Sequence, residues 1–240
     1  MLAQQTKLNK RERRLLRKQG IILNTGMTIK RITPLTDNQH KAFDAYQNGK
    51  HLFLYGTAGT GKTFNALYLS LKDVLKENYQ RVVIVRSVVP SRNIGFLPGS
   101  HIEKSKMYEL PYQEICSELF ERYEAYSILK QKEQIDFMTT SFLRGLTFSN
   151  SIIVIDECQN LNWQELTTIL TRIGNNCRVI LCGDIRQSDL ESNHGRYDLM
   201  KIMDICKKMN TFEFVHMNPN DIVRSGFVKD FILTCEELGY

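Results

Sequence analysis

The sequence predicts an α/β protein built on a mostly parallel sheet with helices on both faces. Two observations carry this prediction. Short runs of Val, Ile and Leu, such as Ser151–Ile155, show no alternation of apolar and polar residues, which is typical of strands buried on both faces. Most of these runs are followed by a segment with apolar residues three or four positions apart, the pattern of an amphipathic helix. Strands that alternate with helices in this way form parallel sheets.

The elements can be assigned in chain order. Thr36-Asp37-Asn38-Gln39 has capping-box spacing and is expected to start a helix that Gly49 ends, and Asn162-Trp163-Gln164-Glu165 starts a later one in the same way. The region 87–110 is expected to be a long loop, of a length that is usually functional or mobile. The expected strands are His51–Tyr55, Arg81–Arg86, Ile135–Thr139, Ser151–Ile155, Val179–Cys182 and Phe212–His216, and the further helices are Lys62–Lys76, Pro111–Gln131 and Tyr197–Met209.

Composition indicates a globular protein of 240 residues, with 42% hydrophobic and 24% charged residues. No apolar run is long enough for a transmembrane helix, and the N-terminus lacks the apolar segment of a secretory signal, so no membrane association is expected. The six cysteines show no metal-ligand spacing and mostly lie in apolar runs. Reduced, buried thiols and a cytoplasmic location are therefore expected.

The positive charge is concentrated near the N-terminus. Residues 7–18 contain seven basic side chains and one acidic side chain, and the whole chain has the same net charge of +6. We therefore expect a basic extension over residues 1–28 and a folded domain over residues 29–240. The extension could contact nucleic-acid phosphates or remain a solvated arm, and the sequence leaves both interpretations open.

The loop Gly56-Thr57-Ala58-Gly59-Thr60-Gly61-Lys62-Thr63 fits the phosphate-binding pattern G-x-x-x-x-G-K-[ST], between an expected strand and an expected helix. Its glycines allow a tight turn in which successive N–H groups point at phosphate oxygens. Lys62 is expected to contact the β- and γ-phosphates of ATP, and the Thr63 hydroxyl is expected to ligate Mg²⁺. The expected helix N-terminus adds partial positive charge.

Two carboxylates follow an apolar strand further along the chain. Asp156 is expected beside Mg²⁺, and Glu157 is expected to act as the general base that polarises the attacking water. An Asp-Glu pair by itself is often only a solvated strand end. The upstream phosphate-binding loop favours the catalytic interpretation.

The residues around these carboxylates carry a family resemblance. Asp156-Glu157-Cys158-Gln159 and Gly183-Asp184-Ile185-Arg186-Gln187 resemble motifs II and III of superfamily 1 helicases. The resemblance implies that Gln187 senses the γ-phosphate and that Gln39 contacts adenine. A capping side chain is the alternative role for Gln39, and the two roles exclude each other.

The resemblance narrows to the PhoH family over roughly residues 34–235. Its blocks, in order, are Arg86-Ser87-Val88-Val89-Pro90, Gly95-Phe96-Leu97-Pro98-Gly99, Phe142-Leu143-Arg144-Gly145, Leu170-Thr171-Arg172-Ile173-Gly174 and Asp221-Ile222-Val223-Arg224. It implies a single RecA-like P-loop NTPase core of the short, single-domain form that bacteriophages encode. It also implies a homo-oligomeric ring, often a hexamer, with ATP hydrolysis and activity directed at RNA in some members. Ser225-Gly226 replaces the His-Pro that is usual in the family, which leaves the local geometry of Arg224 open.

A lone core of this kind leaves the γ-phosphate exposed, so an arginine from a neighbouring subunit is expected to complete the site. Arg224 is the first candidate and Arg172 is the second, and both could instead form surface salt bridges. The function expected is Mg²⁺-dependent ATP hydrolysis coupled to single-stranded nucleic acid, RNA favoured over DNA, with helicase activity a further hypothesis. A small-molecule phosphotransferase and a slow ATP-binding assembly switch are the alternatives.

Overall fold

The computed structural model describes residues 27–87, 101–140, 145–184 and 194–238 of the chain. The basic segment 7–18 lies outside these residues, so the proposed N-terminal extension and domain boundary remain predictions. The described chain begins with an extended segment that packs Met27, Ile29 and Ile32 against the core. This segment is fixed by a hydrogen bond from the Lys30 N–H to the Leu119 carbonyl (2.7 Å).

Six strands form one sheet in the order β3-β2-β4-β5-β1-β6. All five neighbouring pairs are parallel, which confirms the predicted α/β class. Because β5 lies between β1 and β4, the segments after these three strands meet at one edge of the sheet. The strands are β1 (His51–Gly56), β2 (Arg81–Arg86), β3 (Ile135–Thr139), β4 (Ser151–Ile155), β5 (Arg178–Gly183) and β6 (Phe212–Met217).

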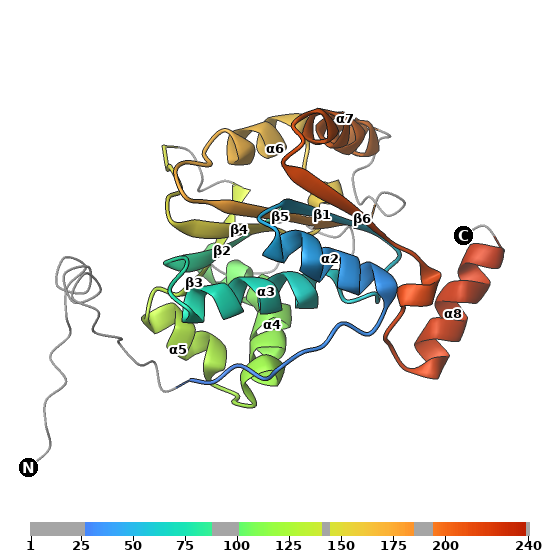
Figure 1. Ribbon diagram of the computed structural model, residues 1–240, viewed down its shortest axis with the longest axis horizontal. Helices are drawn as coiled ribbons and strands as arrows, with labels where there is room; N and C mark the ends of the chain where they lie inside the picture. Colours follow the sequence, from blue (N-terminus) through green and yellow to red (C-terminus); the bar gives the residue numbers. More distant parts are fainter. Residues whose placement is uncertain (1–26, 88–100, 141–144, 185–193, 239–240) are drawn as a thin grey trace, which may run out of the picture.

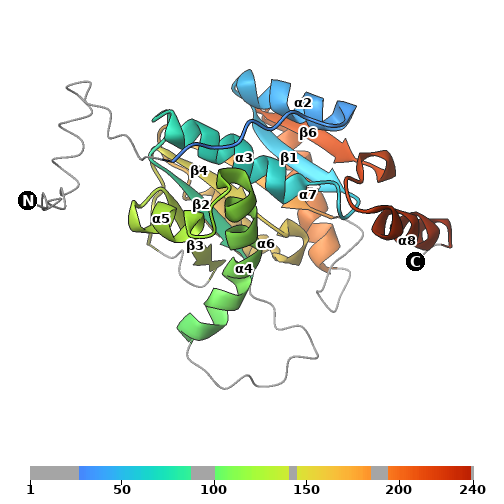
Figure 2. The ribbon, with the colours of Figure 1, turned by 90° about the horizontal axis from the view of Figure 1, so that it is seen from below.

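Helices cover both faces of the sheet (Figure 1). One face carries α2 (Asp37–Gln47), α3 (Lys62–Leu75), α4 (His101–Phe120) and α5 (Ala125–Gln131), which are turned toward the viewer in Figure 2. The other face carries α6 (Trp163–Leu170) and α7 (His194–Lys208). Two short 3₁₀ helices, η2 (Cys158–Asn160) and η3 (Pro219–Asp221), follow β4 and β6, and α8 (Gly226–Glu237) projects from the body of the molecule in both views.

The sheet separates two apolar cores. In β4, Ile152 and Val154 pack on the α3 side, whereas Ile153 and Ile155 pack on the α6 side. Every residue of β4 is buried, which explains why residues 152–155 are all apolar and do not alternate with polar residues. Such strands are stable only when both faces are covered, which is why the pattern predicts this architecture.

Both expected capping boxes begin helices. The Thr36 hydroxyl accepts a hydrogen bond from the Gln39 N–H at the start of α2. At the start of α6, Asn162 and Glu165 bond to each other's backbone N–H groups reciprocally. These caps satisfy N–H groups that have no partner within the helix.

Two expectations for the middle of the chain were wrong. Helix α4 begins at His101, so the last ten residues of the expected loop 87–110 are helical, while residues 88–100 lie outside the described residues. The expected single helix Pro111–Gln131 is two helices, because the chain turns at Glu121, whose φ is +50°. Pro111 lies inside α4, although proline is usually unfavourable in the interior of a helix.

Within the described residues, no helix is long and apolar enough to cross a membrane. All six cysteines are free thiols, and four of them are buried. Burial raises the pKa of Cys116 to about 12 and that of Cys206 to about 11, which keeps both protonated at neutral pH.

Candidate nucleotide-binding site

The phosphate-binding loop connects β1 to α3, as the sequence predicts. Gly61, with φ +80°, is the N-cap residue of α3, and Lys62 is its first helical residue. Gly56 cannot be replaced by a larger residue, because a Cβ there would lie 2.1 Å from the Met217 carbonyl oxygen of β6. The close pairing of β1 with β6 therefore fixes where the loop begins.

Lys62 points into the concavity of this loop. Its Nζ donates to the carbonyl oxygens of Gly56 (2.7 Å) and Thr57 (2.8 Å). Burial lowers the pKa of the Lys62 ammonium, and Asp184 is the strongest of the acidic neighbours that oppose this shift. The two carbonyl oxygens carry only partial negative charge, so an anion in the loop would balance the positive charge of Lys62 more completely.

Asp156 follows β4 and is almost fully buried, with 4% of its surface exposed. Its Oδ1 accepts a hydrogen bond from the Thr63 hydroxyl (2.7 Å), and its Oδ2 accepts one from the Tyr112 hydroxyl of α4 (2.9 Å). Burial raises the pKa of Asp156, with a further contribution from Glu157, whereas these two hydrogen bonds favour the carboxylate. The residues predicted to hold Mg²⁺, Thr63 and Asp156, are thus in direct contact.

Glu157 stands at a left-handed turn with φ +51°, and its side chain lines the same cleft. Gln159 holds it in place, since Nε2 donates to Glu157 Oε2 (2.6 Å) while Oε1 accepts from the Asp184 N–H (3.0 Å). A Cβ at Gly183 would lie 2.5 Å from Cys158 Sγ and 2.8 Å from Gln159 Oε1. Only glycine lets the ends of β4 and β5 approach this closely.

Gln39 joins the start of α2 to the phosphate-binding loop. Its Oε1 accepts from the Leu35 N–H (2.8 Å), and its Nε2 donates to the Thr60 carbonyl (3.2 Å). Its side chain bonds to the backbone of Leu35 and not to that of Thr36, so it does not form the reciprocal bond of a capping box. Both polar atoms of the Gln39 amide are engaged with the protein.

Arg224 lies beside the loop of its own chain. Asp221 accepts hydrogen bonds from Asn38 Nδ2 (2.7 Å) and from the Asn218 N–H (2.8 Å), which ties the segment after β6 to α2. The Val223 N–H then donates to the Gly59 carbonyl (3.2 Å). Arg224 Cγ lies 3.1 Å from the position that a Cβ would take on Gly59.

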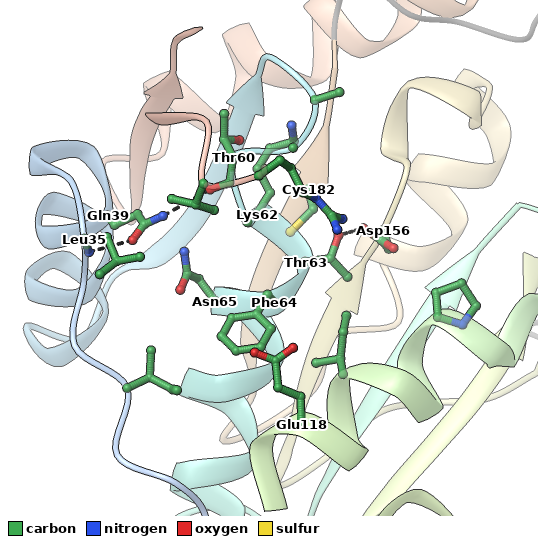
Figure 3. Close-up of a pocket in the computed structure, with 18 of the residues that line it drawn as sticks. Leu35, Gln39, Thr60, Lys62, Thr63, Phe64, Asn65, Glu118, Asp156 and Cys182 are labelled. Atoms are coloured by element: carbon green, nitrogen blue, oxygen red, sulfur yellow. Dashed lines mark hydrogen bonds between the residues drawn. The ribbon is translucent and has the colours of Figure 1, made fainter. Parts of the chain in front are cut away.

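These elements enclose a cleft of about 660 Å³ (Figure 3). That volume suits a nucleotide-sized ligand. Figure 3 shows Leu35 and Gln39 on one side of Lys62, and Thr63 and Asp156 on the other. Among the lining residues are Arg31, Ile32, Leu35, Gln39, Ala58, Gly59, Thr60, Gly61, Lys62, Thr63, Phe64, Asn65, Glu118, Asp156, Glu157, Asp184, Val223 and Arg224.

Most of the predicted site residues meet here, but Arg172 does not. Arg172 lies at the other end of the strands, where its carbonyl accepts from the Phe148 N–H (2.8 Å) just before β4. Its Nε is buried and has no hydrogen-bond partner among the described residues. Gln187 lies outside the described residues, so its predicted role as a γ-phosphate sensor remains untested.

Several residues of the site were not identified from the sequence. Gln159 and Asp184 sit inside the two motifs, and their strand-end positions were the available signal. Tyr112 lies in an amphipathic helix far from any motif, and Asn65 has no pattern of its own. Nothing in the sequence pointed to either residue.

The donor set fits Mg²⁺ bound together with a triphosphate. Among the described residues, no cluster of three or more His, Cys, Asp or Glu side chains could hold a metal alone. Mg²⁺ needs few protein ligands at a nucleotide site, because phosphate and water oxygens supply the rest. One hydroxyl, Thr63, and one carboxylate, Asp156, are sufficient for that arrangement.

A parallel sheet with a phosphate-binding loop after β1 and paired carboxylates after β4 defines a RecA-like P-loop fold. The family profile described as PhoH-like protein matches residues 31–236. The chain belongs to the PhoH-like family, in agreement with the resemblance noted in the sequence.

Curated relatives have the same name. A PhoH-like protein of Synechocystis sp. is 31% identical over 198 residues, covering 82% of this chain and 60% of the relative. One from Mycobacterium tuberculosis is 29% identical over 213 residues, covering 88% of this chain and 59% of the relative. The chain therefore spans about three fifths of the length of these relatives.

Solved structures give more distant matches. The SWI2/SNF2 ATPase core of Sulfolobus solfataricus in complex with dsDNA matches with a TM-score of 0.46 and 18% identity, over 79% of this chain and 46% of that one. Unliganded Pif1 from Bacteroides sp. matches with a TM-score of 0.41 and 16% identity, over 87% and 48% of the two chains. The fold assignment above rests on the strand order of this chain.

Proposed function

We propose that this protein hydrolyses ATP in a Mg²⁺-dependent reaction. The observation that carries the proposal is the convergence of Lys62, the Thr63–Asp156 pair and Glu157 on one cleft. Bound Mg²⁺ would neutralise charge on the β- and γ-phosphate oxygens. Lys62 adds a fixed positive charge beside the same oxygens, and its two carbonyl contacts aim its ammonium into the loop.

Glu157 is the group we assign to water activation. Its carboxylate is held by Gln159, which is itself fixed by the Asp184 N–H. A carboxylate positioned in this way can accept a proton from the water that attacks the γ-phosphate. Gln159 is therefore a positioning residue, and Glu157 is the proposed catalytic base.

Phosphate release from ATP, with and without Mg²⁺, tests the proposal. We expect Lys62→Ala to lose nucleotide binding, and Glu157→Gln to retain binding while hydrolysis falls about a hundredfold or more. Glu213→Gln is the matched control, because Glu213 pairs with Lys41 (3.0 Å) and does not line the cleft. Hydrolysis that survives Glu157→Gln would contradict the assignment of the base.

Two alternatives remain open to the same assay. A phosphotransferase would release little free phosphate under any condition, and would form ADP only when a small-molecule acceptor is present to take the γ-phosphoryl group. A slow assembly switch would bind ATP tightly with negligible turnover. Strong stimulation by single-stranded RNA or DNA would favour the first proposal.

A cation–aromatic cluster on α6 and α7 supports coupling to single-stranded nucleic acid. Trp163 and Tyr197 are 37% and 60% exposed. Lys201 Nζ lies 5.8 Å from the Trp163 ring centroid and 4.2 Å from that of Tyr197. The Trp163 N–H bonds to Asp198 (3.0 Å), so the two helix starts are joined. Exposed rings with a lysine between them suit base stacking beside a phosphate backbone.

Trp163 is the only tryptophan of the chain, so fluorescence excited selectively at tryptophan reports on this cluster. We expect single-stranded RNA to quench that fluorescence and Tyr197→Ala to weaken RNA binding about tenfold. Tyr123→Ala is the control, because Tyr123 is 88% exposed but lies between α4 and α5 on the other face of the sheet. RNA-stimulated hydrolysis with unchanged fluorescence would place the RNA elsewhere.

Helix α8 supports assembly into a homo-oligomeric ring. Phe227 and Phe231 are 81% and 63% exposed, and their spacing places them on one face of the helix. Exposed apolar faces of this kind mark interaction surfaces. We expect light scattering to show that Phe231→Glu lowers the mass of the oligomer. Met209→Glu, at an exposed position just after α7, should leave the mass unchanged. The scattering mass also gives the ring size, for which we propose six subunits.

Arg224 is the arginine we assign to the γ-phosphate. Its contact with Gly59 favours action within its own subunit, while Arg172 stays the candidate for action from a neighbour. Mixing Arg224→Ala with Lys62→Ala subunits decides between the two for Arg224. Restored hydrolysis in mixed oligomers would indicate action across the interface.

The six free thiols fit the cytoplasmic location that we propose.

A further inference from the structure

Asn65 carries a buried amide nitrogen with no partner among the described residues. Only 3% of the surface of Asn65 is exposed, and its Nδ2 lacks a hydrogen bond to this part of the chain. Buried amide groups in folded proteins are nearly always hydrogen-bonded. An apolar residue would suit this position in α3 better if packing were its only task, because Ala66, Leu67 and Leu69 beside it are all buried. Because Asn65 lines the cleft, a bound ligand can supply the partner that the described residues do not.

Asn65 lies in the wall of the nucleotide cleft. Its Nδ2 is 3.5 Å from the position that a Cβ would take on Gly61, and Gln39 Nε2 is 3.7 Å from the same position. Two side-chain amides thus approach one glycine of the phosphate-binding loop. The amide oxygen and nitrogen of Gln39 are already bonded to the backbone of Leu35 and Thr60. The Nδ2 of Asn65 has no such bond among the described residues. Of the two side chains, Asn65 is therefore the one that can bond to a ligand without first breaking a hydrogen bond.

The position of Asn65 identifies the part of the nucleotide that it would meet. Thr63 and Asp156 mark the end of the cleft that takes Mg²⁺, and Lys62 marks the phosphates. Figure 3 shows Asn65 away from Asp156, between Gln39 and Phe64. Leu35 and Phe64 supply apolar surface at this end of the cleft, which suits a flat base.

We propose that Asn65 recognises the base and makes the site selective for adenine over guanine nucleotides. A carboxamide offers one donor and one acceptor in a plane, which match the N6 amino group and N7 of adenine. Guanine presents two acceptors, O6 and N7, at that edge, so one amide group stays unsatisfied. This inference rests on the proposed binding of ATP, and it assigns base recognition to Asn65 while Gln39 holds the loop.

Nucleotide binding to wild type and Asn65→Leu tests the inference, with ATP, GTP and 2′-deoxy-ATP as probes. We expect wild type to prefer ATP over GTP by about tenfold or more, the discrimination typical of a bidentate amide contact. Asn65→Leu should lose that preference through weaker ATP binding, with the change in KM larger than the change in kcat. The melting temperature without nucleotide should stay level or rise, because an unpaired amide is removed. A structural role would instead lower it.

Two further variants keep the test decisive. Ser70→Ala removes another buried polar group of α3, whose hydroxyl bonds to the Ala66 carbonyl (2.6 Å) outside the cleft, and it should leave the ATP-to-GTP ratio unchanged. Asn65→Ala serves if leucine prevents folding. Equal binding of ATP and GTP by wild type overturns the inference, as does an unchanged ratio in the Asn65 variants.

The third probe, 2′-deoxy-ATP, distinguishes a contact to the ribose from a contact to the base. If Asn65→Leu removes discrimination between ATP and 2′-deoxy-ATP but keeps that between ATP and GTP, the amide contacts the ribose and the inference fails. Selective, Asn65-dependent binding without any hydrolysis would support the inference and refute the proposed ATPase. Hydrolysis of ATP and GTP at equal rates and affinities would do the reverse.

Discussion

Replacing Tyr112 by phenylalanine removes one oxygen atom from the centre of the site. That hydroxyl donates to Asp156 Oδ2 (2.9 Å), and both side chains are buried. Burial raises the pKa of Tyr112, with a further contribution from Asp156, so the phenol stays protonated and remains a donor. Phenylalanine keeps the ring and its packing against Phe137. The change therefore removes only hydrogen bonds of the hydroxyl, the one to Asp156 and the one shared with Arg86.

The magnitude follows from the charge of the acceptor. Hydrogen bonds to charged groups contribute about 1.5–3 kcal/mol each. For a domain of this size, we expect the melting temperature to fall by roughly 3–10 °C. Asp156 also loses one of the two bonds that orient its carboxylate toward Thr63, and losses of this kind weaken metal binding about 10–100-fold. The Mg²⁺ concentration for half-maximal hydrolysis should rise accordingly.

The chain contains a matched control. The Tyr126 hydroxyl donates to Glu109 Oε2 (2.7 Å), also between buried side chains, but outside the nucleotide cleft. Tyr126→Phe should lower the melting temperature to a similar extent and leave the Mg²⁺ dependence of phosphate release unchanged. Melting curves and Mg²⁺ titrations of both variants separate stability from metal binding.

One result would refute the reasoning directly. If Tyr112→Phe melts at a lower temperature but hydrolyses ATP with the wild-type Mg²⁺ dependence, Asp156 does not depend on Tyr112 for its orientation. An equal shift in Mg²⁺ dependence for both variants would show that the effect is general destabilisation.

Three further predictions concern other parts of the fold. Gly183→Ala should destabilise by about 1–3 kcal/mol and slow hydrolysis, because its Cβ would meet Cys158 and Gln159, whereas Gly226→Ala, with open space around it, should be neutral or stabilising by thermal melting. Arg178→Met should cost about 1–3 kcal/mol in chemical unfolding, since Arg178 Nη1 bonds to the Tyr46 and Lys50 carbonyls (both 2.9 Å), whereas Lys41→Met, in an exposed pair with Glu213, should cost less than about 1 kcal/mol. Burial, with Arg178 nearby, lowers the pKa of His51 from 6.5 in the folded state, so the unfolded chain takes up a proton first and stability should fall as pH drops below about 6.5. His51→Asn, which keeps an acceptor for the Val179 N–H, should reduce that loss between pH 7.5 and 5.5, and an equal loss in both proteins would contradict it.

Much of the fold was predictable because local patterns and tertiary packing agree. The apolar runs of β2 and β4 are buried on both faces, the capping box of α6 forms as its spacing requires, and Thr36 caps α2. The break at Glu121 was not predictable, since glutamate rarely adopts positive φ and gives no signal that it will do so. Helix α8 could have been found from the spacing of Phe227, Phe231 and Val228, Ile232, although none of the described residues covers its exposed face.

The candidate site divides in the same way. Lys62, Thr63, Asp156 and Glu157 were predictable because the chemistry of phosphate binding fixes their spacing and strand-end positions. Tyr112 and Asn65 were not, because their roles depend on which helix faces lie against the cleft. Such packing is settled only when α3 and α4 are in place on the sheet.

The short link between Arg224 and α8 has a mechanical consequence. Ser225 alone separates Arg224 from the first residue of α8, and Val223 is bonded to the loop that would surround the phosphates. A partner that repositions α8 and moves Val223 with it would therefore alter nucleotide affinity, and by thermodynamic reciprocity nucleotide would alter the affinity for that partner. Contacts on the projecting helix would thus be coupled to the phosphate-binding loop through one short covalent link.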